Sequence, residues 1–514
     1  MHASRRRSFY GFLLLASATA VLLTIYSSSY FPVQADETNL AWAAKQISAG
    51  RTPYVDFFSF IPPGILYMLG AFFKVFGASL ASLRLLTIAL LLVMTLILYL
   101  LFQTTRLSAG WSAAAAFAIP SLYMPFWPVP SHHWFAMTFG LAGLLAVEGE
   151  ETSPTRWFAG GLLVGISGMC LQTEGAFFAL FLGAALFLEN HGGKRKKAAA
   201  YLSGIALPLA VFALILTLSG ALECGFYDLV RWPYTYYKQV GGFNDVNPFI
   251  FLADKFISVL PKEWTIIAIS PIIILLSALV APAAALCAPA LSPEWISPAR
   301  RPTGRWILST VGFFLVFTIY LKGRADWTHL CVWTPLLLLL FVKAVDWRGE
   351  RWRTRFFKAW VIVVLVIAFL RWPAVWFESP PAMHGITITD AEVQEHSLPK
   401  LVDVIPGARE KKASVLYLGK AGSTLYFYWA PHPPPMDWIM PPSARYNAFW
   451  EYRMLSNFAV RYRVPYIVVP GKQMSAFLDQ PSPLSALLKG RYKPFMTTRW
   501  GNVMKRKEDA PGTP

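Results

Sequence analysis

Residues 36–64 read DETNLAWAAKQISAGRTPYVDFFSFIPPG and follow the first membrane-length apolar run of the chain. The stretch opens on two adjacent carboxylates, Asp36 and Glu37. A carboxylate beside a lipid bilayer is costly unless it is paired or has a chemical role. We therefore expect chemistry where the first apolar run meets this polar segment.

The composition around this stretch is that of a membrane protein. The chain has 514 residues, of which 55% are hydrophobic and only 14% are charged, and its mean hydropathy is +0.46. A soluble domain carries about 25% charged residues. The deficit of charge, spread over many long apolar runs, predicts a multi-pass α-helical membrane protein.

The net charge of +18 does not indicate a nucleic-acid-binding protein. Lys and Arg cluster in short loops between apolar runs, where they act as topology signals, and no nucleic-acid recognition motif accompanies them. The cysteines show neither a CxxC motif nor a ligand spacing, so neither a zinc finger nor a disulfide framework is supported; they are Cys170, Cys224, Cys287 and Cys331.

A transmembrane helix needs about 20 apolar residues, and the chain has about eleven such runs. The first follows Arg5-Arg6-Arg7 and also resembles a signal peptide, but its full membrane length favours a retained span. Two shorter stretches, 37–49 and 62–76, are expected to be helices at the membrane interface. The expected spans are 9–29, 80–103, 109–126, 131–147, 157–171, 174–189, 197–219, 264–290, 305–321, 327–345 and 357–376.

The loops between these runs differ in charge. One set of alternate loops is rich in Lys and Arg, which predicts that it is cytoplasmic, together with the N-terminus. The other set should face outward, and it holds the unusual polar groups: Asp36-Glu37, Ser131-His132-His133, Gln172-Thr173-Glu174, the loop 220–263 and residues 322–326.

After residue 376 prolines, charges and short strand-like runs replace the apolar spans. Residues 414–418 and 465–469 are predicted strands, and 388–404 and 444–460 predicted helices. We therefore divide the chain into a transmembrane catalytic domain, 1–376, and a small extracytoplasmic α/β domain, 377–514. The basic residues 505–507 are expected to lie in a mobile polar tail.

The order of motifs in the first outward loop resembles a known family. Asp36-Glu37 is followed by Gly50-Arg51-Thr52-Pro53-Tyr54-Val55-Asp56, Pro62-Pro63, Phe76-Gly77 and Arg84. This order resembles the GT-C glycosyltransferases, in particular the bacterial protein-mannosyltransferase-like and lipopolysaccharide-core-type branch. The polar turn 323–330 adds to the likeness. The resemblance covers residues 1–376 in architecture and 36–84 in motif.

The resemblance implies that a sugar moves from a polyprenyl-phosphate carrier to an acceptor hydroxyl on the outer side. The hydroxyl must lose a proton as it attacks the anomeric carbon, and a carboxylate can accept it. By position, Asp36 matches the family's general base, and Glu37 matches the second acidic residue, which orients the site or a cation. The alternative is that the first carboxylate merely caps the helix 37–49.

The leaving lipid phosphate needs cations placed before the reaction. Arg84 matches a family arginine, and Arg324, Arg51 and Lys322 are the other candidates on the outer side. Arginine suits bidentate contact with phosphate. The alternative is an interfacial arginine that reaches for lipid head groups.

Five further residues are candidate substrate contacts: His132, His133, Glu174, Asp326 and His329. Many relatives carry an acidic residue where this chain has its two histidines, so the use of a metal stays open. Adjacent histidines do not share a helix face, which argues against a dedicated zinc site. An aromatic-belt role for the histidines and an ordinary turn role for Glu174 are the alternatives.

The predicted function is therefore a membrane glycosyltransferase of the cell envelope, in a bacterial inner membrane. Its partners would be a polyprenyl-phosphate sugar and a lipid, polysaccharide or protein acceptor. No cofactor is required by the sequence, although a divalent cation remains an option. A transporter or flippase of lipid-linked glycans is the main alternative, but such proteins favour charges at the membrane midplane and repeated halves, and neither is visible. A polysaccharide assembly protein is a third reading.

Overall fold

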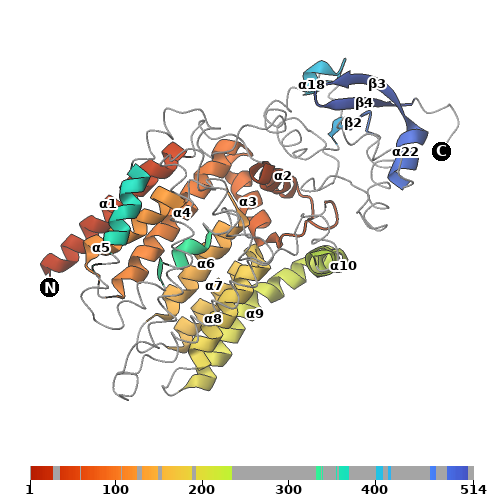
Figure 1. Ribbon diagram of the computed structural model, residues 1–514. Helices are drawn as coiled ribbons and strands as arrows, with labels where there is room; N and C mark the ends of the chain where they lie inside the picture. The colour runs from red at the N-terminus through yellow and green to blue at the C-terminus, as the bar shows by residue number, and fades with distance from the viewer. Residues whose placement is uncertain are drawn as a thin grey trace, which may run out of the picture.

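The computed structural model describes residues 2–26, 35–57, 59–105, 107–123, 130–148, 153–187, 193–233, 332–336, 338–339, 355, 358–369, 401–408, 415–417, 464–469 and 483–507. Most of these residues form a bundle of helices, and those near the C-terminus form a small sheet (Figure 1). The bundle elements are α1 (His2–Tyr26), α2 (Ala35–Ser48), α3 (Pro63–Phe76), α4 (Leu80–Gln103), α5 (Ala109–Ala118), η1 (Ile119–Tyr123), α6 (His132–Val147), α7 (Pro154–Cys170), α8 (Gln172–Phe187), α9 (Lys194–Leu218), α10 (Leu222–Phe226) and η3 (Tyr227–Arg231).

The expected apolar runs match these helices where the structure describes them. Seven runs correspond to α1, α4, α5 with η1, α6, α7, α8 and α9. Parts of two more are helical, at 332–336 with 338–339 and at 358–369, whereas 264–290 and 305–321 lie outside the described residues. Among the helices described, Ala81–Gln103 and Lys194–Leu218 are long and apolar enough to cross a membrane by length and composition.

Local sequence explains where several helices begin. The side chains of Ser79, Ser131 and Ser153 accept hydrogen bonds from backbone N–H groups in the first turns of α4, α6 and α7. Such caps satisfy donors that have no partner inside the helix. Pro63 and Pro154 occupy the first turns of α3 and α7, where a missing N–H costs nothing.

The bundle is packed closely by glycines. A Cβ added at Gly161 of α7 would lie 2.1 Å from the Tyr201 carbonyl oxygen of α9, and one at Gly204 of α9 would lie 2.3 Å from the Phe158 carbonyl oxygen. Only glycine permits such an approach of two backbones, as at other membrane helix interfaces. A core containing Trp134, Trp157 and Trp333 fills the space among α1, α4, α5, α6, α7 and α8.

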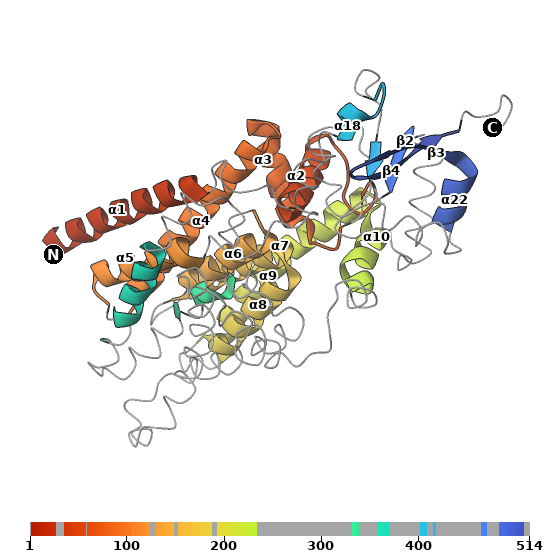
Figure 2. The ribbon, with the colours of Figure 1, turned by 45° about the horizontal axis from the view of Figure 1, so that its top comes forward.

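The helix α2, which we expected at a membrane interface, is largely covered by other parts of the protein. Residues 37–44 are all buried, including the polar side chains of Glu37, Thr38 and Asn39. The helix packs beside α3, and both views place these two helices between the long helices and the sheet (Figure 2).

The C-terminal sheet has four described strands in the order β1-β2-β4-β3. The β1–β2 pair is parallel, and β2–β4 and β3–β4 are antiparallel. The elements are α18 (Leu401–Val404), β1 (Val415–Tyr417), β2 (Tyr466–Val469), α22 (Pro483–Arg491), β3 (Tyr492–Thr498) and β4 (Gly501–Arg506).

The sequence correctly predicted the strands β1 and β2 and the end of the helix 388–404 at α18. The predicted helix 444–460 lies outside the described residues. The expectation of a polar tail at 505–507 was wrong, because Lys505 and Arg506 belong to β4. Within this strand Val503 and Met504 are buried, and Lys505 and Arg506 are partly exposed.

Candidate functional site

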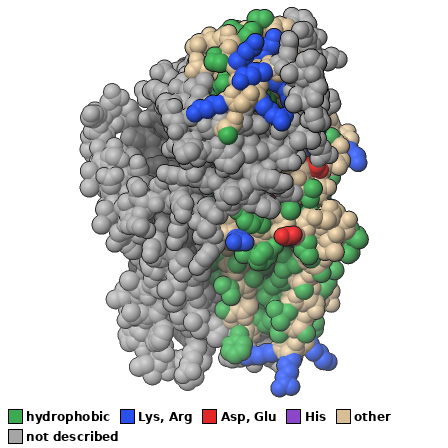
Figure 3. All heavy atoms as spheres, turned by 90° about the vertical axis from the view of Figure 1, so that its right-hand side faces the viewer, with side chains coloured by type: hydrophobic (Ala, Val, Ile, Leu, Met, Phe, Trp, Pro, Cys, Tyr) green, Lys and Arg blue, Asp and Glu red, His purple; other side chains and the backbone are tan. Residues whose placement is uncertain are grey.

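The bundle has two ends of different character. We call the site end the one where α2 and α3 lie and where α4, α6 and α8 begin. We call the basic end the opposite one, where α9 begins with Lys194, Arg195 and Lys196, all exposed. In Figure 3 the Lys and Arg side chains below the bundle lie at this basic end.

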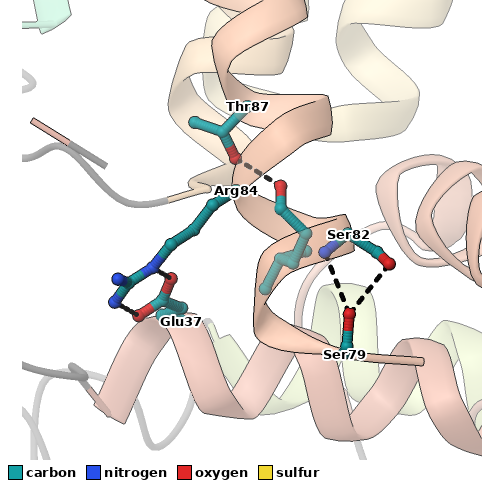
Figure 4. A network of polar contacts seen from close by, with 6 residues as sticks. Glu37, Ser79, Ser82, Arg84 and Thr87 are labelled. Atoms are coloured by element: carbon teal, nitrogen blue, oxygen red, sulfur yellow. Dashed lines mark hydrogen bonds and ion pairs between the residues drawn. The ribbon is translucent and has the colours of Figure 1, made fainter. Parts of the chain in front are cut away.

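At the site end, Glu37 of α2 and Arg84 of α4 form a two-pronged ion pair (Figure 4). Arg84 donates from Nε to Glu37 Oε1 at 2.8 Å and from Nη2 to Oε2 at 3.0 Å. The Glu37 side chain is fully buried and that of Arg84 is 12% exposed. Parallel N–H···O bonds of this kind fix both position and orientation of the guanidinium.

The start of α4 is arranged to hold Arg84 in place. Ser79 accepts a hydrogen bond from the Ser82 N–H at 3.0 Å, and its hydroxyl lies 2.9 Å from that of Ser82. One turn beyond, the Thr87 hydroxyl donates to the Leu83 carbonyl oxygen at 2.9 Å. Figure 4 shows Arg84 leaving this capped turn toward Glu37.

Asp36 lies in the first turn of α2, directly before Glu37. Its backbone belongs to the described helix, but its side chain lies outside what the structure describes. Both residues of the acidic pair are thus at a helix N-terminus, where negative charge is favourable. Of the two, Glu37 has a described partner, the cation Arg84.

A second buried pair joins α6 to α8. His133 Nδ1 lies 2.5 Å from Glu174 Oε1. The Thr173 hydroxyl donates to Glu174 Oε2 at 2.7 Å, so both carboxylate oxygens have a partner. Glu174 is fully buried, and such a group is stable inside a protein only when it is hydrogen-bonded in this way. The His132 ring lies 4.4 Å from the His133 ring, centroid to centroid.

Close backbone packing sets the position of this second pair. A Cβ on Gly175 would lie 2.1 Å from Gly168 Cα, so α8 begins against the last turns of α7. A Cβ on Gly64 would lie 2.5 Å from the Met169 carbonyl oxygen, which brings the start of α3 to the same place. The Ser167 hydroxyl donates to the Ala136 carbonyl oxygen at 2.7 Å and ties α7 to α6.

Sequence reasoning missed a third polar feature, formed by Tyr54 and Asp228. Tyr54 is a non-glycine residue with φ of 69°, fully buried, and its hydroxyl donates to the Ile61 carbonyl oxygen at 2.9 Å. Asp228, in the π-helix η3, accepts a hydrogen bond from the Ser59 N–H at 3.3 Å. Burial, with a contribution from the Asp228 carboxylate, raises the pKa of Tyr54 well above its usual value.

Strained backbone and π-helical turns both occur preferentially at functional sites. Here the hydrogen bond from Ser59 to Asp228 joins residues 51–61 to residues 221–232. The stacked rings of Phe60 and Trp232, whose centroids are 5.5 Å apart, join the same two segments. An acidic residue alone in the apolar run 224–230 was the signal that could have found Asp228.

The structure brings together four of the predicted site residues as two pairs, Glu37 with Arg84 and His133 with Glu174. His132 lies beside the second pair. Arg51 lies at the turn that ends α2, where its N–H donates to the Gln46 carbonyl oxygen at 3.0 Å. Lys322, Arg324, Asp326 and His329 lie outside the described residues. Within the described part of the chain, no group of three or more His, Cys, Asp or Glu could hold a metal ion.

Comparison with known proteins shows which solved structures have a similar fold. No protein-family model and no curated protein sequence matches the chain. Among solved structures, the chain is similar to ArnT from Cupriavidus metallidurans bound to undecaprenyl phosphate, with 15% identity over 96% of this chain and 97% of that one and a TM-score of 0.56.

Archaeoglobus fulgidus oligosaccharyltransferase structures are also similar. One, AglB in complex with an inhibitory peptide and a dolichol-phosphate, has 13% identity over 98% of this chain and 75% of that one, with a TM-score of 0.51. Another, tethered with an acceptor peptide, has 14% identity and a TM-score of 0.50 over 97% of this chain and 74% of that one. The chain therefore shares its overall fold with ArnT and with the oligosaccharyltransferase.

Proposed function

We propose that the protein is a membrane glycosyltransferase that moves a sugar from a polyprenyl-phosphate carrier to an acceptor hydroxyl. The observation that carries the proposal is the buried Glu37–Arg84 pair beside Asp36, at the end of a bundle with this fold. One structural neighbour was solved with undecaprenyl phosphate and another with dolichol-phosphate, which supports a lipid-linked donor.

In the proposed reaction Asp36 is the general base. The acceptor oxygen attacks the anomeric carbon and the bond from that carbon to the phosphate oxygen breaks. The acceptor proton passes to the Asp36 carboxylate, and the electron pair leaves with the polyprenyl phosphate. A single displacement of this kind inverts the anomeric centre.

The cations would act on the lipid phosphate. Arg84 is held in advance by Glu37, so it needs no reorganisation when negative charge develops on the leaving group. We assign Glu37 to this positioning role, because both of its oxygens accept hydrogen bonds from Arg84. Arg324, Arg51 and Lys322 are the further proposed phosphate contacts.

The second pair would contact the sugar or the acceptor. Glu174 fixes the ring of His133, and His132 lies beside it; Asp326 and His329 are the remaining proposed substrate contacts. We place this site on the outer side of a bacterial inner membrane, with the N-terminus in the cytoplasm, because the exposed cations gather at the opposite end.

The direct test supplies the purified protein with a polyprenyl-phosphate sugar and a cell-envelope acceptor fraction. A transferase releases free polyprenyl phosphate and forms a product with inverted configuration at the anomeric carbon. A flippase would leave the donor intact and move it between leaflets of a vesicle. Movement of the donor between leaflets without release of polyprenyl phosphate contradicts the proposal. A product with retained configuration at the anomeric carbon contradicts the single displacement.

A further inference from the structure

The C-terminal elements α22, β3 and β4 concentrate positive charge. Residues 483–507 contain seven Lys and Arg residues and no Asp or Glu. Figure 3 shows Lys and Arg side chains gathered over this part of the molecule, at the top of the view. The seven are Lys489, Arg491, Lys493, Arg499, Lys505, Arg506 and Lys507, of which Lys505 and Arg506 are partly exposed and the other five exposed.

Three of these cations have a local structural role. Lys507 Nζ donates to the Lys489 carbonyl oxygen at 2.9 Å and to the Gly490 carbonyl oxygen at 3.1 Å, which satisfies the end of α22. Lys489 and Arg491 lie in the last turn of α22, where positive charge is favourable. Lys493 and Lys505 lie on the two strands of the hairpin.

Lys493 of β3 and Lys505 of β4 lie directly opposite each other in the antiparallel pair. Like charges in this position destabilise a sheet. Lysine and proline on an exposed edge strand protect against pairing with other chains, and this accounts for Lys493 and Pro494 of β3. It does not account for Lys505, because β4 lies between β2 and β3.

Aromatic side chains lie among these cations. Lys505 Nζ is 5.5 Å from the centroid of the Phe495 ring, and the Arg499 guanidinium is 4.3 Å from that of Trp500. Phe495 is 40% exposed. Aromatic faces suit the apolar faces of sugar rings, and the cations beside them suit carboxylate or phosphate groups.

The same residues fit a membrane surface poorly. A protein segment that inserts into a lipid interface carries an extended apolar face beside its cations. Among the described side chains of residues 483–507, Phe495 is the one large hydrophobic residue that is exposed. A soluble anionic sugar chain needs no such face, so charge and composition favour it.

We propose that the hairpin surface, formed by Lys493, Phe495, Arg499 and Lys505, binds an anionic saccharide. We further infer that this saccharide is part of the acceptor, which names a substrate class for the transferase. The acceptor role rests on the proposed function, whereas the binding itself does not. The surface would hold the acceptor chain near the site end, on which the sheet lies in Figure 1.

The test uses the full chain in detergent and oligogalacturonate as the probe, with maltohexaose as its neutral counterpart. The wild type should bind the anionic chain and bind the neutral one at least tenfold more weakly. The double variant Lys493→Gln/Lys505→Gln should weaken binding of oligogalacturonate by roughly tenfold or more, because two surface charges are lost. Its thermal midpoint should be unchanged or higher, since a repulsive pair is removed.

The matched control is Lys194→Gln/Lys196→Gln, which removes the same charge from the basic end and should leave binding unchanged. Equal binding of both sugars, or an equal loss in the control, overturns the proposal. Binding of phosphatidylglycerol vesicles that depends on Lys493 and Lys505, without binding of the glycan, overturns it in favour of a membrane contact. Asp36→Asn separates the two proposals: it should abolish transfer and leave glycan binding intact.

Discussion

The two ends of the helix bundle hold charged side chains in opposite ways. At the site end, Glu37 and Glu174 are fully buried and both are bound by named partners. At the basic end, Lys194, Arg195 and Lys196 are exposed, and of the four cations that open α9 only Lys197 is buried. Water solvates exposed charges at little cost, whereas each buried charge demands a partner. Burial, more than the number of charges, therefore marks the end of the bundle where chemistry is to be sought.

The largest expected effect comes from Glu37→Gln, which leaves the Arg84 guanidinium without its anion. Breaking a buried ion pair by removing one partner costs about 3–5 kcal/mol. We expect a large fall in the thermal midpoint in detergent and loss of polyprenyl phosphate release.

The matched change at the basic end is Arg156→Gln. Arg156 is exposed and donates from Nε to the Ala146 carbonyl oxygen at 2.8 Å. The expected cost is about 0.5 kcal/mol, as for most surface changes. Equal losses of stability in the two variants would contradict the contrast between the ends.

The second pair is tested by a double-mutant cycle of His133→Ala and Glu174→Gln. If the short contact at 2.5 Å is a strong interaction, the single variants should not be additive, and the coupling should be about 2 kcal/mol. The measurement is the thermal midpoint of both single variants and the double variant. Additive losses would show that the two side chains act independently.

A third prediction separates packing from charge. Gly175→Ala would place a Cβ 2.1 Å from Gly168 Cα, which must push the start of α8 and Glu174 away from α7. We expect a loss of about 1–3 kcal/mol, as for other overpacked sites. Gly168→Ala is the control, because its Cβ would lie at an ordinary 3.7 Å from Gly175 Cα. If both variants are equally stable, close packing does not set the position of Glu174.

Among the buried sites, the smallest effect is expected from Tyr54→Phe, which removes the hydrogen bond to the Ile61 carbonyl oxygen at a cost of about 1 kcal/mol. The raised pKa of Tyr54 adds a dependence on pH. A group whose pKa is raised by folding loses its stabilising contribution as pH rises above the unfolded value of about 10. The wild type should therefore lose more stability than Tyr54→Phe between pH 9 and 11, measured at equal ionic strength (about 0.1 M). Parallel curves of stability against pH for the two proteins would contradict the raised pKa of Tyr54.

The sequence predicted the helices of the bundle because their apolar runs are long. It also predicted which polar groups would gather, since Glu37, His133 and Glu174 all fall at the ends of apolar runs on one side. It could not predict which of them would pair, because the Glu37–Arg84 contact joins residues of two helices that only packing brings together.

The failures have similar physical causes. The burial of α2 could not be predicted, because its composition is that of an interfacial helix, and only tertiary packing covers residues 37–44. Asp228 was missed because the stretch 220–263 was expected to be a loop, and its aromatic residues suggested the membrane interface. The β3–β4 hairpin was missed because its lysines resemble those of a solvated tail, and only the pairing of Lys493 with Lys505 shows that they share a sheet.

The most direct test of the account is a single-turnover assay of Asp36→Asn against Asp403→Asn, an exposed carboxylate of α18. Both variants lose one acidic group, but only the first removes the proposed base. The account predicts that Asp36→Asn slows release of polyprenyl phosphate by at least about a hundredfold while its thermal midpoint stays near that of the wild type, and that Asp403→Asn releases it at the normal rate. Release at the wild-type rate by a folded Asp36→Asn protein would contradict the assignment of the reaction to this end of the bundle.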